Sequence, residues 1–183
     1  MNWRRWLGRV IVTLALAGVL HVAIVMAIPY VVTGVFISRS VARFGVNHAV
    51  APPLPTDQAR TVVKPSPDLL YAVCIYDVSQ GPVRVTLAPP RSYWSLSLFD
   101  RNSDNIFRAN ASDLPGESVT LTLVAQKDAV EHRLPQKDLV VVPHARGVLL
   151  ARFLVLDASS MPAALAAQRS VTCTPATGQR TSS

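Results

Sequence analysis

The sequence contains few of the residues from which chemical sites are built. Its 183 residues include two cysteines and four histidines, and no histidine lies close in sequence to either cysteine, which excludes a zinc site of ordinary ligand spacing. A glycine-rich phosphate-binding loop is also missing, and Ser95 and Ser97 do not lie in the context of a nucleophile elbow or a Ser-His-Asp triad. We therefore expect no metal and no cofactor, and the sequence assigns no reaction.

Acidic residues are absent from the first 43 positions, and this absence accounts for most of the net charge of +7. Residues 1–43 contain five arginines, whereas residues 44–183 contain 13 Lys and Arg against 11 Asp and Glu. The basic residues of the second part are scattered singly, unlike the clustered charge of a nucleic-acid-binding surface. The charge therefore indicates the flank of a membrane segment and argues against a nucleic-acid partner.

A long apolar run follows the first arginines. Residues 10–37 contain no Asp, Glu, Lys or Arg, and about 20 residues suffice for a helix to cross the hydrocarbon core. We predict a membrane anchor with basic flanks over residues 1–43, which contacts the lipid bilayer through residues 10–37. A cleaved signal peptide is the alternative, but the run is about twice as long as the apolar region of such a peptide.

The arginines on either side of the run predict its orientation by a narrow margin. Three of them precede the run, at positions 4, 5 and 9, and two follow it, at positions 39 and 43. Because cytoplasmic flanks carry the excess of positive charge, we expect the N-terminus in the cytoplasm. The folded part would then be exported to a compartment that allows disulfides.

The composition changes after the anchor. Residues 51–57 contain three prolines, which cannot continue a helix and favour an extended chain. We therefore predict a proline-rich linker over residues 44–60, a folded domain over residues 61–175 and a disordered polar tail over residues 176–183.

Short apolar runs between turn signals predict strands in this domain. The first three are residues 71–78, 83–88 and 93–99, which two proline-containing turns would join into a β-meander. Further strands are expected at residues 118–125, 139–142 and 147–156, the last two as inner strands because they are uniformly apolar. A serine followed by proline predicts a short helix over residues 163–169. The expected fold is mainly β, an antiparallel β-sandwich with one N-terminal transmembrane helix and a short C-terminal helix.

Four segments of this domain resemble a known family. They are Lys64–Tyr71 (KPSPDLLY), Asp77–Val83 (DVSQGPV), Tyr93–Asp100 (YWSLSLFD) and Asp104–Phe107 (DNIF). The pattern is similar to that of the bacterial domain-of-unknown-function 1254 family, here in a short membrane-anchored form. The resemblance implies a jelly-roll-like sandwich and a binding or assembly module in the periplasm, anchored in the bacterial inner membrane. Because family members often occur beside or fused to a domain-of-unknown-function 1214 protein, it also implies such a partner, with a homo-oligomer as the other assembly left open.

Charged and aromatic residues at the ends of the predicted strands form the candidate site. We expect six of them to line one mouth of the sandwich and to bind a small polar ligand such as a sugar or polyol, namely Asp68, Tyr71, Tyr93, Asp100, Asn105 and Arg152. In the alternative interpretation, Asp100 and Arg152 form a structural ion pair while Asp68 and Asn105 fix turns. A hydrolase that uses Asp68 and Asp100 also stays open, because glycosidases need two carboxyl groups about 5 Å or 6.5–9.5 Å apart.

The two cysteines have two interpretations. Cys74 lies in the first predicted strand, and Cys173 follows the predicted C-terminal helix. In an exported domain they can form a disulfide that closes a loop of about 100 residues. Two unpaired cysteines that act as small apolar residues are the alternative.

Overall fold

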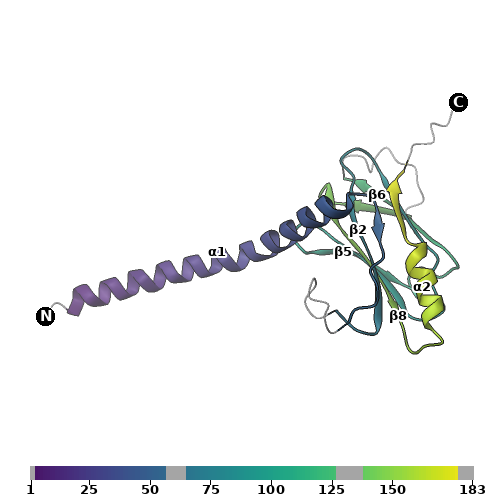
Figure 1. The fold of residues 1–183 in the computed structure, drawn as a ribbon. Helices are drawn as coiled ribbons and strands as arrows, with labels where there is room; N and C mark the ends of the chain where they lie inside the picture. The colour runs from purple at the N-terminus through teal and green to yellow at the C-terminus, as the bar shows by residue number, and fades with distance from the viewer. Residues whose placement is uncertain (1–2, 57–64, 127–137, 177–183) are drawn as a thin grey trace, which may run out of the picture.

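The computed structural model describes residues 3–56, 65–126 and 138–176. A long helix leads from the N-terminus to a β domain, and a second, short helix packs on the side of that domain (Figure 1). The helices are α1 (Trp3–Phe44) and α2 (Met161–Ser170). The strands are β1 (Ala49–Val50), β2 (Leu69–Asp77), β3 (Val83–Leu87), β4 (Trp94–Phe99), β5 (Asn105–Asn110), β6 (Val119–Ala125), β7 (Leu139–Val142), β8 (Arg146–Leu154) and β9 (Thr172–Pro175).

The strands form two sheets, as the predicted sandwich requires. Sheet A has the order β1-β2-β8-β4-β5 and sheet B the order β7-β6-β3-β9. Every neighbouring pair is antiparallel except β6 and β7, which are parallel. The mainly β, largely antiparallel fold with one long N-terminal helix and one short C-terminal helix is therefore confirmed.

The predicted β-meander is wrong. Strands β2 and β4 belong to sheet A but are separated by β8, and β3 lies in sheet B. The turns after β2 and after β3 therefore cross between the layers instead of joining neighbours. The prediction that residues 139–142 form an inner strand is also wrong, because β7 is the edge strand of sheet B and exposes 43% of Val141.

The hydrophobic core lies between the two sheets. Alternate residues of β2, β4 and β8 point inward, and Trp94, Tyr76 and Phe153 are the largest of the fully buried side chains. Helix α2 adds Ala164 and Ala167 to the same cluster. Because inward and outward positions alternate along a strand, the odd-numbered residues of β2 and β4 lie on the outer face of sheet A.

The predicted linker is held against the domain over the part that the structure describes. Strand β1 pairs with β2, Leu54 packs against the core, and the carbonyl oxygen of Pro52 accepts a hydrogen bond of 2.7 Å from Gln168 Nε2 of α2. Residues 57–60 of this segment lie outside the described residues. So does the predicted tail apart from Ala176, whose N–H donates to the Pro82 carbonyl at 2.8 Å.

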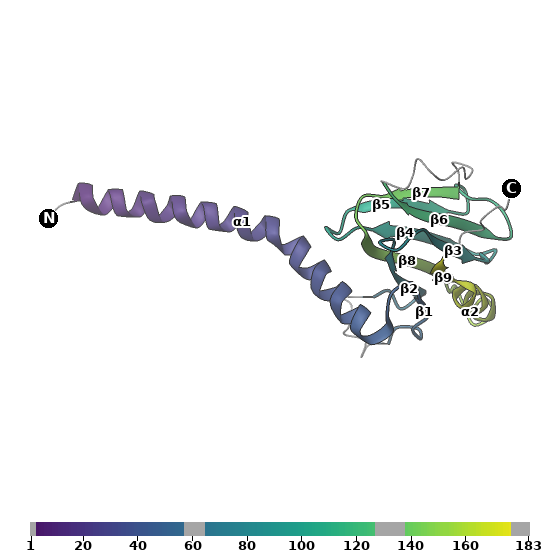
Figure 2. The same ribbon diagram turned by 90° about the horizontal axis from the view of Figure 1, so that it is seen from above.

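Helix α1 is long enough and apolar enough to cross a membrane. Its 42 residues correspond to about 63 Å at 1.5 Å per residue, roughly twice the hydrocarbon thickness. It continues past Pro29 without interruption and bends on the way to the domain (Figure 2). It ends where Gly45 takes a φ of +80°, in the left-handed region that favours glycine, and donates its N–H to the Val41 carbonyl at 2.9 Å.

The last turns of α1 pack on the outer face of sheet A. Ile37 is buried against Ile75 of β2 and Val148 of β8. One turn earlier, the hydroxyl of Thr33 contacts the hydroxyl of Ser103, in the loop between β4 and β5. Helix α1 and the β domain are therefore packed together and not merely connected by a flexible chain.

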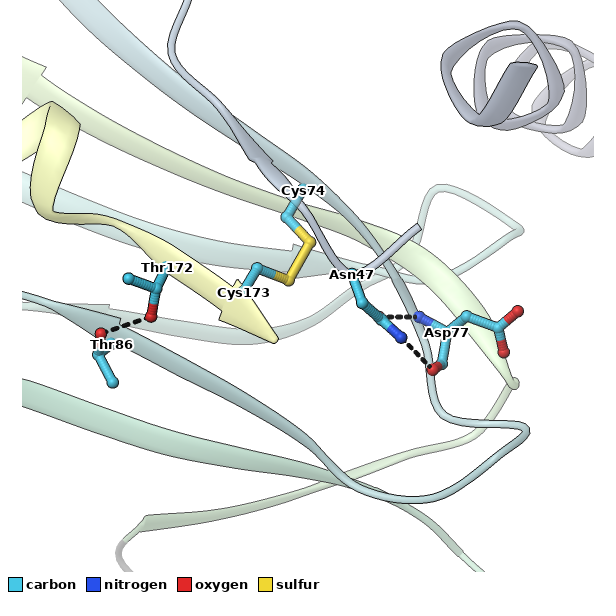
Figure 3. Close-up of a disulfide and its surroundings, with 6 residues drawn as sticks. All are labelled: Asn47, Cys74, Asp77, Thr86, Thr172 and Cys173. Atoms are coloured by element: carbon cyan, nitrogen blue, oxygen red, sulfur yellow. Dashed lines mark hydrogen bonds between the residues drawn. A yellow bond between two sulfur atoms is a disulfide. The ribbon is translucent and has the colours of Figure 1, made fainter. Parts of the chain in front are cut away.

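A disulfide joins the two layers. Cys74 of β2 in sheet A is bonded to Cys173 of β9 in sheet B, and both residues are at most 2% exposed (Figure 3). Nearby, Thr86 of β3 and Thr172 of β9 share a hydrogen bond of 2.6 Å between their hydroxyl groups. The final strand is thus held covalently to sheet A and by hydrogen bonds to sheet B.

Candidate functional site

The six predicted site residues lie at opposite ends of sheet A. Asp68 immediately precedes β2 and Tyr93 immediately precedes β4, and both flank the C-terminal end of β8. Asp100 and Asn105 lie at the other end of β4, about 20 Å away along the strand. The structure therefore does not bring the six residues to one mouth of the sandwich.

Tyr71 and Arg152 are neighbours on the outer face of sheet A. They are directly opposite each other in the β2–β8 register. The Tyr71 hydroxyl accepts a hydrogen bond of 2.9 Å from the Ser66 backbone N–H, and Arg152 donates to two hydroxyls of β4, Ser95 and Ser97. This part of the predicted set lies on an open sheet face.

Asp100 has a structural partner other than Arg152. Its Oδ2 lies 3.1 Å from His144 Nδ1, and its Oδ1 accepts the backbone N–H groups of Asn102 at 2.7 Å and Asp104 at 3.1 Å. The carboxylate therefore organises the loop between β4 and β5, where Ser103 takes a φ of +68°. The alternative Asp100–Arg152 ion pair is not formed.

The carboxylate pair considered for a hydrolase is not assembled. Asp68 is exposed at the start of β2, whereas Asp100 is buried at the far end of β4. Because β2 and β4 both pair antiparallel with β8, they run in the same direction, and the two residues lie at opposite ends of the sheet. Their separation far exceeds the range of about 5 to 9.5 Å that glycosidases use.

The sequence did not single out a second acid–base pair next to the end of α1. Asp77 Oδ2 accepts a hydrogen bond of 2.5 Å from Arg146 Nε, and its Oδ1 accepts the Ser79 N–H at 2.9 Å. The amide of Asn47 pairs with the backbone N–H and carbonyl of Asp77 at 2.8 and 2.9 Å (Figure 3). Asn47 takes a φ of +54°, which asparagine tolerates better than most residues. These bonds join the segment that follows α1 to β2.

Asp77 should make the domain sensitive to acid. Burial by itself would raise the pKa of Asp77, but the hydrogen bonds from Ser79 and the charge of Arg146 outweigh it, and the pKa lies below its ordinary value. A lowered pKa gives stability that is present above the ordinary value of about 3.9 and is lost as the pH falls through the folded value. We expect Asp77→Asn to flatten the decrease in melting temperature between about pH 5 and pH 2. Asp104→Asn is the control, because it removes an exposed carboxylate that forms no ion pair within the described residues, and an equal flattening in this variant would contradict the assignment to Asp77.

Sequence reasoning did not include three neighbours of Arg152 on the outer face of sheet A in the candidate site. They are Ser95 and Ser97 of β4 and Arg108 of β5. Ser95 and Ser97 alternate with Trp94, Leu96 and Leu98, a pattern that indicates one polar and one apolar face. That alternation was a usable signal for an outward-facing polar row.

The described residues contain a shallow depression away from the predicted site. It measures about 380 Å³ and lies between the β3–β4 and β5–β6 connections, lined by residues that include Arg91, Trp94, Leu114 and Glu117. None of the six predicted residues lines it. Within residues 3–56, 65–126 and 138–176, no group of three or more His, Cys, Asp or Glu side chains is placed to hold a metal ion.

Comparisons with known proteins give a family and a fold. The family described as "Protein of unknown function (DUF1254)" matches residues 46–175. No curated protein matches the chain. The structure is similar to that of the VPA0106 protein from Vibrio parahaemolyticus, with a TM-score of 0.61 and 16% identity over 81% of this chain and 35% of that chain. An uncharacterised protein from Burkholderia cenocepacia has a TM-score of 0.48 and 17% identity over 73% of this chain and 38% of that chain. The chain thus spans just over a third of the length of these solved structures. The likeness to the Vibrio protein concerns the fold alone.

Proposed function

Because this chain belongs to the DUF1254 family of proteins of unknown function, we propose that it is a membrane-anchored binding or assembly module. In this proposal α1 crosses the bacterial inner membrane once, with its N-terminus in the cytoplasm, and the β-sandwich lies in the periplasm. The partner is a protein of the domain-of-unknown-function 1214 family, and a second copy of this chain is the other partner to test.

The observation that carries the proposal is the incomplete cover of sheet A. Helix α1 packs over the end of the outer face that contains Ile75 and Val148. The neighbouring positions toward the other end keep exposed or half-buried polar and cationic side chains, such as Arg108 and Arg152. A face of this kind beside a docked anchor suits a protein contact better than catalysis, because the described residues show no assembled carboxylate pair there.

The packing of α1 on the domain also supports a position of the β domain close to the lipid surface. If the hydrocarbon ends near Pro29, as twenty residues from Val10 predict, Thr33 lies about 6 Å further along the helix. The contact of Thr33 with Ser103 would then hold the β4–β5 loop at the level of the headgroups.

Reporter domains fused after Ser183 test the orientation, since the proposal predicts activity of a periplasmic reporter and none of a cytoplasmic one. The opposite pattern would refute it.

Co-purification tests the assembly. The full chain is co-expressed with a domain-of-unknown-function 1214 protein from the same genome, extracted in mild detergent and purified through a tag on one component. We expect a complex of constant composition on size-exclusion chromatography. The proposed function would be contradicted if the chain were recovered as a monomer and without the second protein.

A further inference from the structure

Two arginines and two serines form a polar patch on the open part of sheet A. Arg152 of β8 donates from Nε to Ser95 Oγ at 3.0 Å and from Nη2 to Ser97 Oγ at 3.4 Å. From the other side of β4, Arg108 of β5 lies directly opposite Ser97 in the strand register. We call these four residues the Arg–Ser patch, namely Ser95, Ser97, Arg108 and Arg152.

The serines of the patch are covered although they lie on the outer face of the sheet. Ser95 is 6% exposed and Ser97 is 2% exposed, whereas Arg108 is exposed and Arg152 is half-buried. The two buried hydroxyls accept hydrogen bonds from the Arg152 guanidinium and thereby orient it. A guanidinium has five N–H donors, and only some of them are used in these two bonds.

The charges of the patch lack a protein counter-ion in the part of the chain that the structure describes. The two ion pairs found there use other cations, since Asp77 pairs with Arg146 and Asp100 with His144. Two guanidinium groups on one sheet face, one of them held in place by hydroxyls, are suited to bind carboxylates in bidentate fashion.

The shape of the surface favours a protein over a small molecule. Small-molecule sites are concave, but none of the four patch residues lines the depression of about 380 Å³. The half-buried apolar residues Val73 and Leu150 lie in the same row as Ser97, between the patch and the docked end of α1. Arginine beside apolar surface is typical of protein interfaces.

We propose that the Arg–Ser patch is the contact through which this domain binds an acidic surface of a partner protein, with Asp or Glu carboxylates of the partner on Arg108 and Arg152. This inference rests on the proposed assembly function and names the surface and the chemistry that the assembly would use.

Binding of an acidic peptide tests the patch directly. The full chain is placed in nanodiscs of neutral lipid, and a fluorescein-labelled hexaglutamate peptide is titrated at constant ionic strength with anisotropy as the readout. We expect Arg108→Ala and Arg152→Ala each to weaken binding about tenfold or more, because each removes a charge-assisted hydrogen-bonding group. Arg152→Lys should also weaken it, since lysine keeps the charge but loses the planar fork.

A matched control separates the patch from general charge attraction. Arg84 is exposed on β3 in the other sheet, and Arg84→Ala removes the same charge outside the patch. An unchanged affinity supports the proposal, whereas a loss as large as that of Arg108→Ala overturns it. The Arg108 side chain is exposed and makes no hydrogen bond to another described residue, so its substitution tests the patch even if Arg152→Ala unfolds the domain. Citrate that binds to the patch more tightly than the peptide would identify a small-molecule site instead and would also overturn the proposal.

The same variants distinguish this inference from the proposed function. If the partner co-purifies equally well with the unmodified chain and with the Arg108→Ala/Arg152→Ala chain, the patch proposal fails and the assembly function stands. If no partner co-purifies but peptide binding needs both arginines, the assembly function fails and the acidic specificity of the patch stands.

Discussion

Removal of the Cys74–Cys173 disulfide should lower the free energy of unfolding by about 4 to 5 kcal/mol, because the bond closes a loop of about 100 residues in the unfolded chain. The two cysteines are 99 positions apart, which makes the entropic restriction large. The bond also ties the last strand to sheet A. Since domains of this size are stable by about 5 to 15 kcal/mol, its loss would remove a large share of the total.

Denaturant unfolding of the full chain in detergent measures this effect. The unmodified protein is compared with Cys74→Ala/Cys173→Ala, in the presence and absence of reductant. Reductant should destabilise the unmodified protein and leave the double variant unchanged, and the variant controls for effects of the reductant on the rest of the chain. Mass spectrometry under non-reducing conditions should show the crosslink, and two free thiols in the purified protein would contradict it.

The individual strands could be predicted because their signals are local. The apolar residues at positions 119, 121 and 123 alternate with two threonines, and this alternation alone indicates β6. The length and hydropathy of α1 likewise predict a membrane helix without knowledge of the rest of the chain. The packing of its last turns could not be predicted, because it depends on contacts such as that of Ile37 with Val148, far along the sequence.

The order of the strands could not be predicted, because pairing in this fold joins distant segments. Strand β8 lies between β2 and β4, although Tyr71 and its partner Arg152 are 81 positions apart in the sequence. Nothing near either residue in the sequence specifies that pair. The apolar runs that suggested a meander are equally compatible with turns that cross from one sheet to the other.

The unpredicted strand order also explains why the six predicted site residues do not lie together. The sequence indicates which polar residues lie at strand ends but not which end of the sheet each strand end occupies. Antiparallel neighbours reverse direction, so Arg152, near the end of β8, lies beside Tyr71, near the start of β2. Asp100 follows β4 and therefore lies at the opposite end, where it pairs with His144. The serines of the patch were visible as an alternating pattern, but their relation to Arg108 and Arg152 needed the register.

Gly147→Ala should destabilise the domain by about 3 kcal/mol, the size of a severe overpacking effect in a dense core. A Cβ atom at position 147 would overlap the Tyr76 hydroxyl and the Phe99 carbonyl oxygen, well inside the 3.0 Å that real Cβ contacts respect. Tyr76 lies opposite Gly147 in the β2–β8 register and is fully buried. The missing side chain at Gly147 therefore makes room for the Tyr76 ring.

A double-mutant cycle isolates the cause of this effect. Tyr76→Phe alone removes the hydroxyl that donates to the Phe99 carbonyl at 3.4 Å, and should cost about 1 kcal/mol. In the Gly147→Ala background the same change removes one of the three atoms that would lie within 3.0 Å of the new Cβ, so the double variant should be more stable than the sum of the single effects predicts. Gly34→Ala is the matched control, because a methyl group at that position of α1 meets no atom within 4 Å. Additive effects in the cycle would show that the Tyr76 hydroxyl is not the group that requires glycine at position 147, and would leave the Phe99 carbonyl oxygen and the ring carbon Cζ of Tyr76 as the cause.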